Sequence, residues 1–198
     1  MGKPRKFIRP LGTRRYNKIF IVAAEGDKTE PQYFRMLNSI NKSVIHFKCL
    51  KNLHGSSPIQ ILKVMRDHIK ANGLNKKDEA WLVVDRDDWT EDQLKALVEW
   101  TKEKENYHLA LSNPKFEYWL LLHFEEGTGI KSSHDCSKRL KDHLPHYNKD
   151  IQENKIKPRI SDAVSRAKKK DTPRCKTWPN KSGTTVYRLV EQVFLSGM

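Results

Sequence analysis

Two carboxylates in the middle of the chain have a spacing that suits a metal ion. Asp85 and Asp87 follow the apolar run at residues 80–84, and both side chains can face one side if the strand ends between them. Glu25 follows another apolar run, at residues 18–23. Oxygen ligands without cysteine are typical of Mg²⁺ or Mn²⁺ sites. The three acids therefore predict such a site, and the alternative is an acidic surface turn.

The elements that position these acids are predicted from the periodicity of apolar residues. Strands are expected at residues 18–23, 44–50, 80–84 and 107–111. Helices are expected from Thr29 onward and at residues 58–71, 90–103, 113–124, 135–143, 159–170 and 184–195. Strands that alternate with helices indicate a parallel α/β sheet, and ligands of such sheets bind at the carboxyl ends of the strands. Glu25, the Asp85 and Asp87 pair, and Glu117 all follow predicted strands.

Glu117 is the acid for which two roles stay open. It is the only acid between Phe116 and Phe124, a segment whose apolar residues predict a buried helix. A buried carboxylate needs a partner. Glu117 therefore either binds the metal or forms an ion pair with a cation such as Arg86. His123, in the same segment, is more typical of a core histidine than of a catalytic base.

Three blocks of the sequence resemble one protein family. They read EGDKTEPQYF from Glu25, VVDRDDW from Val83 and SNPKFEYWLLLHF from Ser112, and a weaker block, NKSGTTVYRLV, lies near the end. Together they resemble the RloB-like proteins, which are associated with restriction loci and phage defence. The wider pattern resembles the Toprim domain of topoisomerases, primases and related nucleases. The resemblance implies an α/β fold with a Toprim-like, mostly parallel sheet flanked by helices and a basic helical C-terminal extension.

The same resemblance implies a divalent-metal-dependent endonuclease that cleaves RNA, with tRNA among the candidates, or DNA in phage defence. Glu25 would be the first Toprim carboxylate, and Asp85 and Asp87 would be the metal pair. Related nucleases carry another acid four residues after the first. Here that position is Thr29, and Glu30 follows it. Either Glu30 takes the catalytic role of that acid, or Thr29 only caps the helix.

The positive charge of the chain is concentrated in two segments. The formal net charge is +14; residues 1–18 hold seven cations and no acid, and residues 151–181 hold ten cations and three acids. Clustered cations neutralise phosphates, so we expect contact with nucleic acid rather than only a solubilising tail and a solvated helix face. The residues expected to bind the backbone are Arg14, Arg15, Lys168, Lys169, Lys170, Arg174 and Lys176.

Lys181 is expected to act closer to the chemistry. With Lys176 it lies in a polar loop just before the last predicted helix. A cation beside the scissile phosphate stabilises the transition state of phosphodiester cleavage. Backbone binding is the alternative for both lysines.

Composition sets expectations for partners and location. No apolar run reaches the about 18 residues of a membrane span, and three widely spaced cysteines are typical of the reducing cytoplasm. No P-loop motif occurs, so control by ATP would need a separate ATPase partner. A homo-oligomer is compatible with the sequence.

The expected organisation has three parts. Residues 1–17 are predicted to be a flexible basic arm, residues 18–125 a Toprim-like α/β core, and residues 126–198 a basic helical extension that packs on the core. The alternative to a nuclease is a non-catalytic nucleic-acid-binding Toprim-like module that acts with a partner ATPase.

Overall fold

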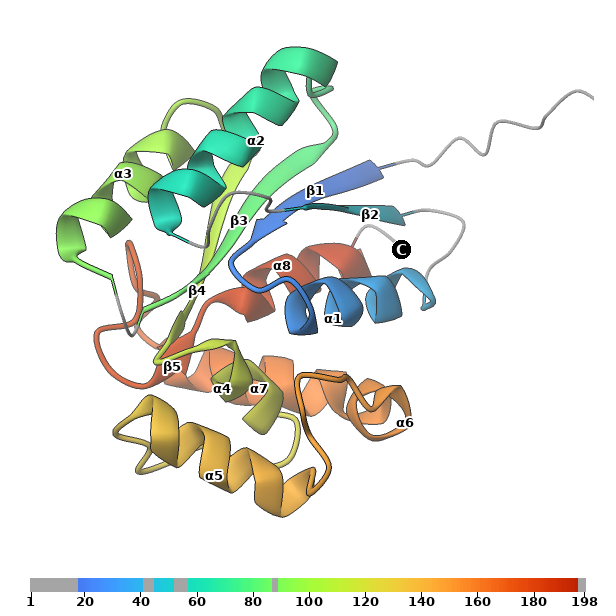
Figure 1. Cartoon of the computed structure of the whole chain (residues 1–198), viewed down its shortest axis with the longest axis vertical. Helices are drawn as coiled ribbons and strands as arrows, with labels where there is room; N and C mark the ends of the chain where they lie inside the picture. The colour runs from blue at the N-terminus through green and yellow to red at the C-terminus, as the bar shows by residue number, and fades with distance from the viewer. Residues whose placement is uncertain (1–17, 41–44, 52–56, 87–88, 196–198) are drawn as a thin grey trace, which may run out of the picture.

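The computed structural model describes residues 18–40, 45–51, 57–86 and 89–195 (Figure 1). The strands are β1 (Lys18–Ala24), β2 (Ile45–Leu50), β3 (Glu79–Asp85), β4 (Tyr107–Asn113) and β5 (Gly183–Thr184). The α-helices are α1 (Thr29–Asn38), α2 (Pro58–Asn72), α3 (Glu91–Thr101), α4 (Phe116–Leu121), α5 (Ser133–His143), α6 (Glu153–Ile156), α7 (Ile160–Lys170) and α8 (Val186–Leu195), and a 3-10 turn, η1 (Lys157–Arg159), joins α6 to α7.

The sheet confirms the predicted α/β class. Its strand order is β2-β1-β3-β4-β5. The first four strands are parallel, and β5 pairs antiparallel with β4 at its carboxyl end. Parallel neighbours place their carboxyl ends at one edge, so β1 and β3 bring the segments after them together.

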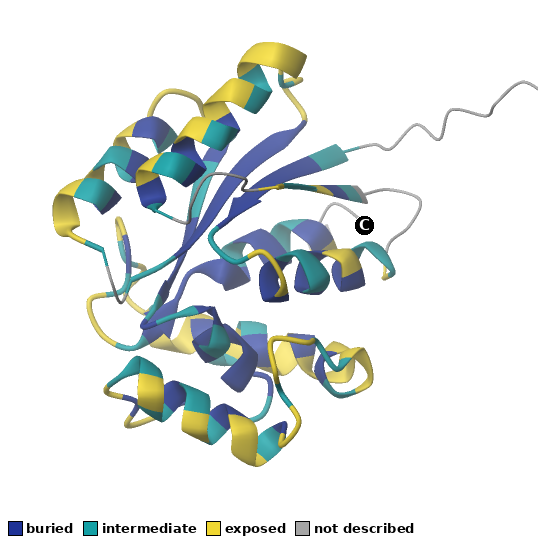
Figure 2. Cartoon of the chain, viewed as in Figure 1, coloured by how far each residue is buried: buried dark blue, intermediate teal, exposed yellow. Residues whose placement is uncertain are grey.

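Helices cover both faces of the sheet, as parallel strands require. Side chains alternate along each strand, so Phe20 and Val22 of β1 enter one apolar cluster while Ile21 and Ala23 enter another. The first cluster includes residues of α1, α4, α7 and α8, and the second includes residues of α2 and α3. Figure 2 shows the buried strands between these two layers.

Local sequence signals account for several helix ends. The Ser57 hydroxyl accepts a hydrogen bond from Gln60 N–H at the start of α2, and Gly73, with a φ of 72°, ends that helix. Glycine adopts this left-handed conformation without the steric cost of a side chain. At α3, Thr90 and Gln93 form a reciprocal capping box that satisfies N–H groups free at a helix start.

Two predicted boundaries around β4 were wrong. The helix expected at residues 113–124 is the shorter α4, because Asn113 still belongs to β4 and donates a side-chain hydrogen bond to Pro179 O at 2.9 Å. The helix expected from residue 184 begins at Val186, and the residues before it form β5. Two residues of strand carry too little periodicity to be predicted from sequence.

The chain after residue 126 contributes to the same core as the strands. Ile160 of α7 and Leu189 of α8 belong to the apolar cluster that contains Phe20 of β1. The predicted division at residues 125 and 126 stays a prediction, and the predicted arm over residues 1–17 lies outside the described residues. Among the helices that are described, none has the length and apolar character needed to cross a membrane.

Candidate active site

The carboxyl ends of β1 and β3 place Glu25 beside Asp85, as predicted. Asp85 N–H donates to Glu25 Oε2 at 3.1 Å, and Glu25 N–H donates to Val83 O at 3.0 Å. The indole N–H of Trp89 donates to both carboxylate oxygens of Glu25, at 3.2 and 3.1 Å. The backbone and the indole therefore fix this carboxylate at the edge of the sheet. Asp87, the third predicted ligand, lies outside the described residues.

A pocket of about 400 Å³ opens at this edge. Its wall includes four of the acids predicted from the sequence to be functional. They are Glu25 after β1, Glu30 on α1, Asp85 at the end of β3 and Glu117 on α4. The other lining residues are Gly26, Asp27, Lys28, Thr29, Phe116 and Lys149. The structure thus brings together acids that are up to 92 positions apart in sequence, which is the separation of Glu25 and Glu117.

Glu30 is the most buried of these acids, at 5% exposed. Burial raises the pKa of Glu30 to about 7, and the negative charges of Glu117 and Glu25 add to the increase, while backbone N–H groups of Glu30 and Gly26 oppose it. A Cβ at position 26 would overlap the Glu30 carboxylate, so any other residue there would force that carboxylate to move.

Thr29 does not cap α1, and that alternative was wrong. The helix begins at Thr29 itself, and the preceding residue, Lys28, makes no side-chain capping bond. The Thr29 hydroxyl instead donates to Lys149 O at 3.0 Å and lies 3.1 Å from the Tyr147 hydroxyl. Thr29 therefore holds the segment before α6 against the start of α1.

Glu117 has a phenol as its partner rather than a cation. The Tyr147 hydroxyl donates to Glu117 Oε1 at 3.1 Å. Burial and then the charge of Glu117 raise the pKa of Tyr147, which keeps this donor protonated. Arg86, the cation named for the alternative of an ion pair, donates from Nη1 to Trp89 O at 2.7 Å. Within the described part of the chain, no ion pair includes Glu117.

Sequence reasoning missed Lys149, which lines this pocket, and two residues near Glu117, Tyr147 and Lys115. Tyr147 and Lys149 come from an irregular segment between α5 and α6, where no periodicity indicates their placement. Lys115 Nζ donates to Ser137 Oγ at 2.8 Å. The charge of Lys115, like the charges of two of the acids, shifts the pKa of the buried Cys136 thiol. After burial, Glu117 and Asp85 raise the pKa of that thiol and Lys115 lowers it. The position of Lys115, two residues before Glu117, was the available signal.

The predicted cations do not gather at the acids. Lys181 is exposed and lies two residues before Gly183, which pairs with Asn113 at the end of β4, but it does not line the acid pocket. Arg174 and Lys176 line a different pocket, beside the start of β4.

The three lysines at the end of α7 also lie away from the acid pocket. Lys168 forms an ion pair with Glu191 of α8 at 3.0 Å. Lys169 and Lys170 are exposed in the last turn of α7. Arg14 and Arg15 lie outside the described residues, so their role as backbone contacts stays a prediction.

His123 is a core residue. It is fully buried, its Nδ1–H donates to Trp119 O at 3.0 Å, and its Nε2 accepts from the Tyr33 hydroxyl at 3.2 Å. Burial lowers the pKa of His123 to about 4. Both ring nitrogens of this neutral imidazole are hydrogen-bonded in the core, away from the pocket, so His123 has a structural role rather than a catalytic one.

The donor atoms at the acid pocket suit a hard cation. They are carboxylate oxygens, which Mg²⁺ and Mn²⁺ prefer. Among the described residues, no group of three or more His, Cys, Asp or Glu side chains is arranged to hold a metal ion. Glu25 and Asp85 are the two described members of the expected triad; Asp87, the third, lies outside the described residues.

One comparison with known proteins identifies relatives of this chain. The family model described as RloB-like protein matches residues 20–193, which contain every strand and helix named above except the first two residues of β1 and the last two of α8. Comparisons with curated proteins and with solved structures find no match.

Proposed function

The chain belongs to the RloB-like family, and we propose that it is a divalent-metal-dependent endonuclease that cleaves nucleic-acid phosphodiester bonds in phage defence. The observation that carries the proposal is the acid pocket, where Glu30 is buried beside Glu25 and Glu117 and its pKa is raised to about 7. Crowded carboxylates destabilise a fold unless a ligand compensates their charge, and such perturbed groups cluster at functional sites.

Each acid has a distinct role in this proposal. Glu25, Asp85 and Asp87 would hold Mg²⁺ or Mn²⁺, an ion that activates water and neutralises charge on the phosphorus. Glu30 would accept a proton, since a pKa near the working pH suits a general base. Glu117, held by Tyr147, would contact the metal or the water.

The remaining parts of the proposal concern partners. The wider Toprim resemblance supports nucleic acid as the substrate, RNA (including tRNA) or DNA. Arg14, Arg15 and the cations of residues 168–176 would bind its backbone, and Lys181 would act beside the carboxyl end of β4. We further propose that the protein acts in the cytoplasm, as a homo-oligomer or with a separate ATPase.

Cleavage of labelled RNA and DNA with Mn²⁺ and with EDTA tests the proposal. We expect Asp85→Asn and Asp87→Asn each to reduce Mn²⁺-dependent cleavage on the order of 100-fold or more, because each removes a charge that the ion needs. Asp142→Asn is the matched control, an exposed acid on α5, and should cleave normally.

Three outcomes would contradict the proposal. Full activity of both variants would show that these acids do not serve catalysis. Binding of nucleic acid without any cleavage, by the parent with Mn²⁺ and with a cellular extract that supplies an ATPase, would favour the non-catalytic binding module. Hydrolysis of small phosphoesters alone would indicate a phosphatase.

A further inference from the structure

A second pocket lies at the edge of the sheet, apart from the acids. Its volume is about 350 Å³, and its lining comes from the start of β4, from α3, from α8 and from the loop between α7 and β5. The loop contributes Arg174 and Lys176, and α8 contributes Arg188. Glu105 is the one acid among the lining residues. The excess of cations indicates an anionic ligand.

The pocket covers a stretch of β4 without a neighbouring strand. β5 pairs only with Ser112 and Asn113, so in the described chain His108 and Leu109 lie on an open edge. Leu109 precedes Ser112 by three residues, which is about 10 Å along a strand, toward the end opposite the acids. The His108 ring packs on Trp81, with centroids 4.5 Å apart, and gives the pocket a flat wall.

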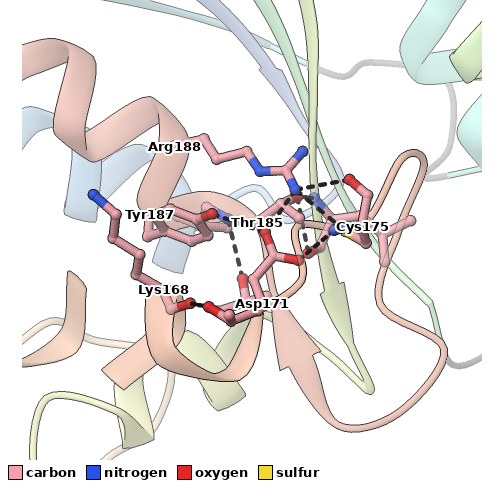
Figure 3. Close-up of polar contacts among 10 residues, drawn as sticks. Lys168, Asp171, Cys175, Thr185, Tyr187 and Arg188 are labelled. Atoms are coloured by element: carbon pink, nitrogen blue, oxygen red, sulfur yellow. Dashed lines mark hydrogen bonds and ion pairs between the residues drawn. The ribbon is translucent and has the colours of Figure 1, made fainter. Parts of the chain in front are cut away.

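A network of polar contacts fixes the cationic side of the pocket, and Figure 3 shows it. Asp171 Oδ2 accepts from Arg188 Nη2 at 2.6 Å and from the Tyr187 hydroxyl at 2.8 Å, and Cys175 N–H donates to Asp171 Oδ1 at 2.8 Å. Arg188 Nη2 also donates to Cys175 O at 3.0 Å. These bonds join α8 to the loop that carries Arg174, so Arg188 and the backbone of that loop are held in place before any ligand binds.

One donor of this network has no acceptor. Arg188 Nε is buried and has no hydrogen-bond partner among the residues that the structure describes. The Arg188 side chain as a whole is 15% exposed and lines the pocket. A buried donor without an acceptor costs free energy. That atom is itself covered, so an anion in the pocket would contact the accessible remainder of the Arg188 side chain.

We propose that this pocket binds a phosphate group, with Arg188 as the buried anchor and Arg174 and Lys176 as the outer cations. A planar guanidinium donates in a fork that matches phosphate oxygens, and charged hydrogen bonds of this kind are strong. The volume falls within the range of small-ligand sites, so the phosphate can belong to a mononucleotide or to a nucleic-acid strand. The site needs neither the metal nor cleavage at the acid pocket.

Titration of the full chain with inorganic phosphate in EDTA tests this site, with chloride holding the ionic strength constant. Binding is measured by calorimetry, and the Nε–H signals of the arginines are followed by NMR. We expect saturable binding and a shift of the Arg188 Nε–H signal. The signal of Arg35, on α1 and outside the pocket, should not move.

A charge-reversed variant separates this pocket from general attraction. Arg174→Glu combined with Lys176→Glu should weaken phosphate binding at least about tenfold, since each charged hydrogen bond contributes about 1.5–3 kcal/mol and 1.4 kcal/mol is tenfold in Kd. Both residues are exposed, so the fold should persist. The matched control, Lys138→Glu with Lys141→Glu, changes the same charge at exposed positions on α5 and should bind as the parent does.

Two results would overturn the assignment: no saturable binding of phosphate, or equal weakening in both double variants. Thymidine monophosphate and a single-stranded DNA without terminal phosphates identify the source of the phosphate. Tighter binding of the mononucleotide assigns the pocket to a free nucleotide, and tighter binding of the strand assigns it to a backbone phosphate. Glu25→Gln should bind phosphate as the parent does. The test of this pocket is therefore independent of whether the acid pocket has nuclease activity.

Discussion

Two buried carboxylates in different parts of this molecule have pKa values that move in opposite directions. Glu30, at the acid pocket, is 5% exposed, and its pKa rises to about 7 because burial is reinforced by two neighbouring acids. Asp171, between α7 and β5, has a side chain that is also 5% exposed. Burial alone would raise its pKa, but hydrogen bonds from Cys175 N–H, Arg188 and Tyr187 outweigh burial and hold it below the usual range.

The difference separates a structural acid from a functional one. Asp171 has its donors within the fold, so its charge stabilises the folded chain. Glu30 has backbone donors, but no cation pairs with it among the described residues. Its charge therefore destabilises the fold until a ligand compensates it, which is the pattern of a site prepared for a cation.

Removing the charge of Asp171 should have the largest effect on stability. Asp171→Asn strands the Arg188 cation, whose side chain is 15% exposed, and breaking a buried pair costs about 3–5 kcal/mol. The lowered pKa means that this loss is complete above about pH 4 and fades as pH falls below it. Urea unfolding measures the change. Asp67→Asn, which breaks an exposed pair with Lys63, should unfold like the parent; equal losses would refute the distinction.

Removing the charge of Glu30 should have the opposite sign. A pKa of about 7 in the folded chain against 4.5 in the unfolded chain corresponds to about 3 kcal/mol. The parent should therefore lose stability as pH rises from 4.5 to about 7, and Glu30→Gln should not. In EDTA at pH 8 the variant should be the more stable protein.

Urea unfolding across this pH range checks the Glu30 prediction. The control is Glu153→Gln, an exposed acid on α6 that should follow the parent at every pH. A Glu30→Gln variant that is less stable than the parent at pH 8 would show that Glu30 is a structural acid like Asp171.

Tyr147→Phe tests how the acid pocket is positioned, with a smaller effect. The change removes the hydroxyl that contacts Glu117 and Thr29 and should cost about 1 kcal/mol. Tyr118→Phe is the control, because its hydroxyl makes one hydrogen bond, to Gly127 O at 3.2 Å, away from the acids. Both variants should lose similar stability, but only Tyr147→Phe should require more Mn²⁺ for half-maximal thermal stabilisation. Identical Mn²⁺ curves would make Tyr147 purely structural.

The acids at strand ends were predictable, and the residues that hold them were not. Glu25 and Asp85 follow apolar strands directly, and parallel pairing fixes where those strands end. Tyr147 contacts Thr29 across 118 positions and Glu117 across 30. Such contacts depend on how an irregular segment folds over α1, and neither propensity nor periodicity encodes that path.

The same reason explains what sequence analysis missed at the second pocket. Arg174 and Lys176 were expected to bind nucleic acid because of the local charge. Arg188 occupies an ordinary helical position in the sequence, and its role as an anchor follows from its contact with Asp171, 17 residues earlier. A run of charged residues in the sequence identifies exposed cations, whereas a buried cation such as Arg188 is identified only from the residues packed around it.

Glu117→Gln should have the smallest effect on the free energy of unfolding and decides between the two roles first considered for Glu117. Glutamine keeps the shape and still accepts the Tyr147 hydrogen bond, and no described cation loses a partner. In EDTA the variant should therefore unfold within about 0.5 kcal/mol of the parent, as surface changes do, or slightly later because one acid near Glu30 is gone. If Glu117 binds metal, Mn²⁺ should raise the melting temperature of the parent and not of the variant. A variant that melts well below the parent in EDTA and in Mn²⁺ alike would show that the charge of Glu117 is structural, and Glu25, Asp85 and Asp87 would then be the acids left to hold the ion.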